Sequence, residues 1–265
     1  MRRGEAAESL RAEEKEEVRM SFAATAHQGV RARSDASLLR MRPAQVLRQF
    51  RALDPDTRKQ ARAAASSVID GLNAFIAKGG VPLAAVLDHS RAREWHQYGA
   101  SETDADSGGI HYFYHSHPAR TTPPGEHGHF HLFARLADAA VEADRLAHLV
   151  CIGVDARGLP SRLFTTNRWV TGGNWLPADE TIALAEKASA ASTQLADPVE
   201  RWLCAQLGVF MPQVAALLVH RDRRIEASAR GNQALEDRRT YVLSQCRVSL
   251  GEQIAAVEQA NQSQP

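Results

Sequence analysis

The histidines of this chain are concentrated in one short stretch. Six of the eleven lie between residues 111 and 131, in the sequence HYFYHSHPARTTPPGEHGHFH. Neutral imidazole is a common ligand for zinc, copper, iron and nickel. The same stretch contains a carboxylate, that of Glu126. The residue types therefore indicate a transition-metal site whose ion is iron, copper or zinc.

The spacing of these histidines fits two strands, because alternate side chains of a β-strand lie on one face. We expect a first strand at 110–117 and a second at 127–135, paired as a hairpin that gathers the imidazoles into a patch. The predicted metal ligands are His115, His117, His127, His129 and His131. Without an ion, such imidazoles would have to stay neutral and find hydrogen-bond partners, because burying them charged is costly. The competing interpretation is that the histidines lie on a solvated sheet face or are an accidental run.

Two further residues are predicted to take part in the chemistry. Glu126 lies at the edge of the histidine patch and is a candidate catalytic carboxylate or an additional ligand. Arg168 follows an expected strand directly, where functional polar groups are common, and its guanidinium could hold a substrate carboxylate or phosphate by a two-pronged contact. Trp169 or Trp175 could form a pocket wall beside it. The alternative is that this loop is purely structural.

The elements that must position these residues are read from hydrophobic periodicity and turn signals. Strands are expected at 110–117, 127–135, 147–154, 160–167 and 241–250, and their short connections favour antiparallel pairing. Helices are expected after Asp54, at 82–95, at 134–146, after Pro177, at 198–207, at 212–228 and at the C-terminus, with a polar loop at 97–109. We predict an α+β fold, a mainly antiparallel sheet with helices before and after it.

The domain organisation follows from composition. Residues 1–40 are rich in Arg, Glu and Ala and poor in large apolar side chains, so we expect a charged extension that favours disorder over a solvated helix. Residues 41–265 are predicted to form a single α+β domain whose histidine-rich sheet occupies 110–167. Asp54 and Pro55 are a typical helix start, and Gly79 is a typical helix end.

The overall composition narrows the classes of partner. Hydrophobic residues make up 44% of the chain, charged residues 24%, and the net charge is +1, which gives no electrostatic reason to expect nucleic acid or membranes. The N-terminus lacks the apolar core of a signal peptide, and Cys151, Cys204 and Cys246 have no disulfide or zinc-finger spacing. We expect a cytoplasmic protein that acts on a small-molecule substrate, with buried free thiols. The oligomeric state stays open.

Two motifs resemble known families in part. His115-Ser-His117-Pro118 resembles the HxHP core of the JAMM zinc isopeptidases, in which both histidines bind zinc. That family continues with a serine and an aspartate ligand, and Gly125 and Gly128 stand at those positions here. The departure removes an aspartate ligand, so the resemblance does not carry peptidase activity to this chain.

The second motif is HGHFHLF, at residues 127–133. It is similar to the signature of the histidine-triad proteins, whose middle histidine, His129 here, attacks a phosphate. Gly128 departs from the usual apolar residue, and a second histidine-rich strand is not a feature of that family. The resemblance implies metal-free phosphate hydrolysis or transfer as an alternative function.

A broader resemblance covers roughly residues 90–225. The segments EHGHFHLF and LFTTNRWVTG, with the helices that follow, resemble a bacterial family described only as a domain of unknown function. Membership implies a shared fold and supplies no activity.

The residues themselves favour a metal-dependent enzyme. Because the histidines outnumber the ligands that one hydrolytic zinc needs, we favour oxygen-dependent oxidation of a small molecule by iron or copper. The alternatives are a zinc-dependent hydrolase, the metal-free phosphate enzyme, and a non-catalytic metal-binding or sensing protein.

Overall fold

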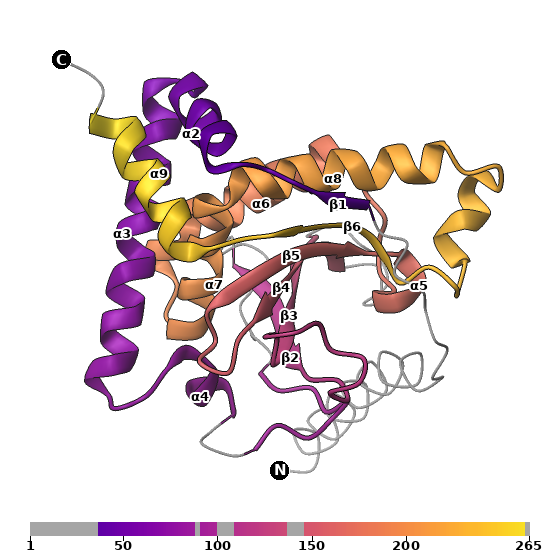
Figure 1. The fold of residues 1–265 in the computed structure, drawn as a ribbon, viewed down its shortest axis with the longest axis horizontal. Helices are drawn as coiled ribbons and strands as arrows, with labels where there is room; N and C mark the ends of the chain where they lie inside the picture. The colour runs from indigo at the N-terminus through magenta and orange to yellow at the C-terminus, as the bar shows by residue number, and fades with distance from the viewer. Residues whose placement is uncertain (1–36, 88–90, 100–108, 137–145, 263–265) are drawn as a thin grey trace, which may run out of the picture.

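The computed structural model describes residues 37–87, 91–99, 109–136 and 146–262. Within these ranges, six strands form one sheet in the order β1-β6-β5-β4-β3-β2 (Figure 1). Neighbouring strands are antiparallel except β1 and β6, which run parallel. Helices lie both before and after the antiparallel strands in the chain. The predicted α+β class with a mainly antiparallel sheet is confirmed.

The strands agree closely with their predicted positions, apart from the first. Their bounds are β1 Ser37–Leu39, β2 Ile110–His115, β3 Gly128–Arg135, β4 Leu146–Val154, β5 Pro160–Thr166 and β6 Val242–Arg247. The sequence patterns did not predict β1, which is formed by the last residues of the expected N-terminal extension and pairs with β6. A three-residue edge strand is too short to show a period.

The larger helices pack against one face of this sheet. Their bounds are α2 Pro43–Ala52, α3 Pro55–Ala77, α4 Pro82–Leu87, α5 Arg168–Thr171, α6 Ala178–Ala191, α7 Pro198–Val209, α8 Met211–Glu226 and α9 Leu250–Gln262, with 3-10 turns at Ser192–Gln194 and Gly231–Glu236. Among the described residues, no single helix is long and apolar enough to cross a membrane. Helices α7 and α8 pass that test only as a pair, bent by 77°.

The start and end of α3 follow the predicted signals. The Asp54 carboxylate accepts hydrogen bonds from the backbone N–H groups of Asp56 and Thr57, both at 3.0 Å, which satisfies donors that have no partner inside the helix. Pro55 occupies the first helical turn, where a missing N–H costs nothing. Gly79 then takes a φ of 75°, a conformation that ends the helix.

One face of the sheet forms the main hydrophobic core with the helices. Tyr114, Phe130 and Leu163 belong to this face and are buried, and Trp202 of α7 lies in the same cluster. Figure 1 shows α3, α6, α7 and α9 gathered on this side. Because side chains alternate along a strand, His115, His129 and His131 point to the opposite face, which is also buried along β3. The histidine patch is therefore enclosed rather than spread over a solvated sheet.

Some expectations differ from the structure or lie outside it. The helix predicted at 82–95 ends at Leu87, and beyond it Glu94 and Tyr98 form isolated bridges with Ser116 and Tyr114 at the end of β2. Most of the N-terminal extension, of the loop at 97–109 and of the helix at 134–146 lies outside the described residues.

Candidate metal centre

Strand register brings the candidate ligands together. His115 of β2 lies opposite His129 of β3, and Phe113 lies opposite His131. His131 in turn lies opposite Cys151 of β4. Since these residues alternate with core residues along each strand, their side chains project from the same face of the sheet. The centre of this face is a cluster of imidazoles drawn from three neighbouring strands.

Three of the imidazoles form a compact unit, which we call the three-histidine group: His115, His129 and His131. Their ligand atoms lie within 4.8 Å of one another. The Nε2 of His129 is 2.8 Å from that of His115 and 3.2 Å from that of His131. Around a tetrahedral ion with metal–nitrogen bonds of 2.0–2.1 Å, the nitrogens would be about 3.4 Å apart. Both distances from His129 are slightly shorter than this, so a small expansion would admit an ion.

A metal ion would change the interactions that these three rings can make. A neutral imidazole carries one N–H and one acceptor nitrogen. The Nε2 of His129 has two imidazole nitrogens within hydrogen-bond distance, yet it can make only one good hydrogen bond, as either donor or acceptor. A cation instead accepts the lone pairs of all three rings at once. The buried group could therefore hold a metal ion.

Burial keeps these rings in the form that binds metal. Removal from water, with a smaller contribution from the neighbouring His117, lowers the pKa of His115 to about 3. Burial is also the main cause that holds the pKa of His129 and of His131 well below the usual value, with other imidazoles adding to the effect. The rings are consequently neutral at physiological pH, with lone pairs available for ligation.

Glu126 and Arg162 support the group from one side. The Arg162 guanidinium donates two hydrogen bonds to the Glu126 carboxylate, at 2.8 and 2.9 Å. One carboxylate oxygen lies 3.6 Å from Nδ1 of His129, which has no hydrogen-bond partner among the described residues. That distance is too long for a hydrogen bond, but the negative charge favours the tautomer with a proton on Nδ1. His129 then directs the lone pair of Nε2 at the other imidazoles, a usual role for a carboxylate beside a metal-binding histidine.

Gly153 makes room for this carboxylate. It lies opposite His129 in the neighbouring strand, and a Cβ atom at its position would be 2.5 Å from a carboxylate oxygen of Glu126. Any larger residue would displace Glu126 from its contacts. The structure thus places Glu126 as a neighbour of a candidate ligand, rather than at the nitrogens that converge.

A second set of ligand atoms adjoins the first. We call it the cysteine group: His131, His148 and Cys151, whose ligand atoms also lie within 4.8 Å of one another. The Cys151 Sγ is 3.2 Å from Nδ1 of His131 and 3.3 Å from Nε2 of His148. Burial lowers the pKa of His148 to about 3, with a contribution from Arg221, and raises the pKa of the Cys151 thiol well above its usual value. His131 belongs to both groups through its two nitrogens.

Sequence reasoning missed His148 because of an irregularity in β4. Cys151 follows it three positions along the strand, a spacing that puts side chains on opposite faces of a regular strand. The register between β3 and β4 shifts at Leu132 and Phe133, so that Leu149 is left over as an extra residue. This β-bulge turns His148 onto the face that carries Cys151. The sequence signal was only a histidine and a cysteine on one predicted strand.

The remaining predicted ligands lie around the group. His117 is half-buried, and its ring stacks on His129 with the centroids 5.1 Å apart, while Trp95 makes an edge-to-face contact with it. His127 does not share the face of His129. Its Nδ1 is 2.5 Å from the Tyr114 hydroxyl, on the core side of the sheet. The predicted alternation fails here because β3 begins only at Gly128.

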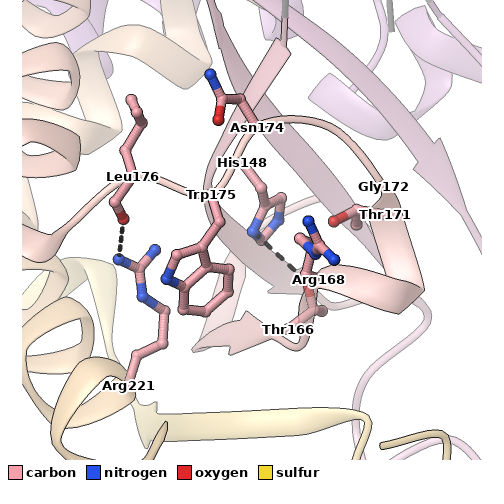
Figure 2. A pocket seen from close by; sticks show the side chains of 9 residues that line it. All are labelled: His148, Thr166, Arg168, Thr171, Gly172, Asn174, Trp175, Leu176 and Arg221. Atoms are coloured by element: carbon pink, nitrogen blue, oxygen red, sulfur yellow. Dashed lines mark hydrogen bonds between the residues drawn. The ribbon is translucent and has the colours of Figure 1, made fainter. Parts of the chain in front are cut away.

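Arg168 lies away from the converging nitrogens, at the start of α5. Its guanidinium pairs with Glu236 at 2.6 Å. It also lines a small cavity together with His148, Trp175 and Arg221, which Figure 2 shows. The cavity measures about 10 Å³, which is room for about one water molecule. Arg168 is thus connected to the cluster only through the cavity and His148.

The comparisons with known proteins yielded one match. Residues 62–248 match the model of a family described as Domain of unknown function (DUF6969). This range includes every histidine and cysteine of the two groups. No curated protein and no solved structure matched the chain.

Proposed function

The chain belongs to the DUF6969 family, whose description carries no activity, and from its residues we propose a metal-dependent enzyme in which the three-histidine group holds a transition ion. The observation that carries this proposal is the convergence of three neutral Nε2 atoms in a buried site. Imidazole ligands of this kind suit iron, copper and zinc.

The donor set leaves room for chemistry. Three protein ligands leave at least one coordination position open for water or substrate, as in catalytic metal sites generally. We propose oxygen-dependent oxidation of a small molecule by iron or copper. Neutral imidazoles bring no charge of their own and so favour the reduced forms of these ions, the forms that react with dioxygen. The small cavity beside His148 has room for about one water molecule.

The other residues have supporting roles in this proposal. Glu126, fixed by Arg162, orients His129 and offsets the charge of the ion. His117 covers His129 at the half-buried edge of the group. Arg168 keeps its predicted role as an anchor for an anionic substrate, which would require it to exchange Glu236 for that substrate.

Two alternatives are supported by particular features. Three imidazoles with an open position also suit a zinc-bound hydroxide, and hence a hydrolase. The deep burial of the ligands, with His131 only 2% exposed, is equally suited to storage or sensing of the ion. The metal-free phosphate mechanism has less support, because the Nε2 of His129 is enclosed between two other imidazoles rather than open to a phosphate.

The proposal is tested by loading the full-length untagged protein with iron, copper or zinc in turn and measuring dioxygen consumption in the presence of a reductant. We expect consumption with iron or copper and none with zinc. His129→Ala should abolish it, whereas His111→Ala, a change on the same face of the sheet, should not. Metal binding without dioxygen consumption, together with zinc-dependent ester hydrolysis, would favour the hydrolase instead.

A further inference from the structure

We infer that the cysteine group holds a second metal ion, a thiophilic one such as zinc, with His131 shared between the two ions. The ligand atoms are those of Cys151, His148 and the Nδ1 of His131. This inference concerns a separate set of atoms from the proposed oxygen-reactive centre, and it holds or fails independently of the reaction that occurs there.

The geometry of the group is that of a site around one point. The Sγ of Cys151 has an imidazole nitrogen on each side, at 3.2 and 3.3 Å. A zinc ion with a sulfur ligand at about 2.3 Å and nitrogen ligands at about 2.0 Å would hold these atoms about 3.5 Å apart. Cys151 and His131 are buried, and His148 is half-buried, so the group could bind an ion with little movement of the strands.

The backbone of β4 sets the position of His148. The β-bulge in β4 interrupts the ladder and leaves Leu149 unpaired, and its local effect is to turn the His148 ring toward Cys151. Bulges re-aim side chains and are common beside functional sites. The Nδ1 of His148 lies 3.5 Å from the Thr166 hydroxyl, whose oxygen could accept a hydrogen bond from Nδ1–H while Nε2 binds the ion.

The charges favour a soft cation at this position. Binding releases the thiol proton of Cys151, and a buried thiolate needs a cation close by. Thiolate and imidazole together select zinc and copper(I) over magnesium or calcium. When both sites are filled, His131 also releases its remaining ring proton and contributes a negative charge between the two ions. The Nε2 and Nδ1 of its ring already face the two groups separately.

Cobalt(II) bound to the full-length protein gives the direct test, because a thiolate ligand produces an intense charge-transfer absorption in the near ultraviolet. The metal-stripped wild type should bind two equivalents of cobalt(II) and show this absorption. Cys151→Ser should lose the absorption and one equivalent. The matched control is Cys246→Ser, since Cys246 is equally buried but belongs to the helix-covered core. The Cys246→Ser variant should keep the absorption and the full amount of bound cobalt(II).

Variants of the histidines separate this inference from the proposed function. His115→Ala should lose one equivalent and keep the thiolate absorption, whereas His131→Ala should weaken both sites by at least about 10-fold. A single equivalent without the absorption, lost in His115→Ala, would overturn the second site and leave the three-histidine centre intact. A single equivalent with the absorption, retained in His115→Ala, would support the second site and overturn the three-histidine centre.

X-ray absorption of the zinc-loaded wild type provides a test that does not depend on the folding of any variant. We expect the zinc ions to have a sulfur ligand in addition to nitrogen. A shell of nitrogen and oxygen only would mean that Cys151 is simply a hydrogen-bonded thiol, and it would overturn the inference.

Discussion

The Nε2 atoms of His115 and His129 lie 2.8 Å apart, on neighbouring strands, and both residues are buried. Their backbones are directly opposite in the ladder, so the approach of the rings is set by the sheet and not by flexible loops. His131, two residues along the same strand as His129, adds the third nitrogen at 3.2 Å. A rigid antiparallel sheet thus presents three neutral ligands before any ion arrives, which reduces the cost of binding.

The first prediction concerns which histidines matter. Replacing His129 by alanine removes the nitrogen that contacts both of the others, so we expect a loss of metal affinity of at least about 100-fold. His111→Ala should leave the affinity within about 3-fold of wild type, because His111 contacts Arg135 and Phe133 and is not one of the three converging ligands. Calorimetric titration with zinc measures both. Equal losses in the two variants would mean that the centre lies elsewhere on the face.

The second prediction concerns the carboxylate behind His129. Glu126→Gln keeps the shape but removes the charge that favours the Nδ1–H tautomer, and it should weaken metal binding by about 10–100-fold. The matched control is Glu236→Gln, which alters a carboxylate paired with Arg168 on the surface. The control should bind as wild type does. A Glu126→Gln variant with unchanged affinity would show that the carboxylate does not act through His129.

The third prediction concerns pH. In the folded metal-free protein, burial lowers the pKa of His115 and of His148 to about 3, whereas in the unfolded chain the value is about 6.5. The unfolded state therefore binds more protons between these values, and stability falls as the pH drops below about 6.5. At pH 5 each of these buried rings should cost on the order of 2 kcal/mol relative to pH 7.5.

Urea unfolding of the metal-free protein at the two pH values measures this difference. His148→Asn should show a smaller dependence on pH than the wild type, since one group that must stay neutral has been removed. A free energy of unfolding that is the same at both pH values would contradict the burial of these rings.

The fourth prediction concerns Gly153. An alanine Cβ would lie 2.5 Å from the Glu126 carboxylate, so Gly153→Ala should destabilise the protein by about 1–3 kcal/mol and weaken metal binding as Glu126→Gln does. Gly251→Ala is the control, because a Cβ at this position in α9 meets open space. Chemical unfolding and zinc titration of both variants are the measurements. An unaffected Gly153→Ala variant would show that Glu126 can leave its position freely.

Regular periodicity predicted much of the fold and part of the site. The alternation at His129 and His131 correctly places these rings on one face, and the signals at Asp54 and Gly79 locate the ends of α3. In each case the information is local, because a strand of known parity or a helix cap depends on only a few neighbouring residues. To predict which histidines approach each other, the register of the sheet would also have to be known.

The features that the sequence did not predict depend on distant residues or on irregular backbone. His148 reaches the cluster only because a β-bulge breaks the parity of β4, and no local pattern marks that bulge. His127 leaves the face because β3 begins one residue later than the alternation suggests. Glu126 is held beside His129 by a hydrogen bond from Arg162. Arg162 comes from another strand, β5, and lies far away in the sequence.

The central claim is that the three-histidine group binds a transition ion, and the most direct measurement is the metal content of the full-length untagged protein. Wild type purified by conventional chromatography and the triple variant of His115, His129 and His131 to alanine would be compared by elemental mass spectrometry. We predict at least about one equivalent of iron, copper or zinc in the wild type. The triple variant should hold at least one equivalent less than the wild type. A wild type below about 0.2 equivalents of any transition metal, unchanged in the variant and not restored by added metal, would contradict it.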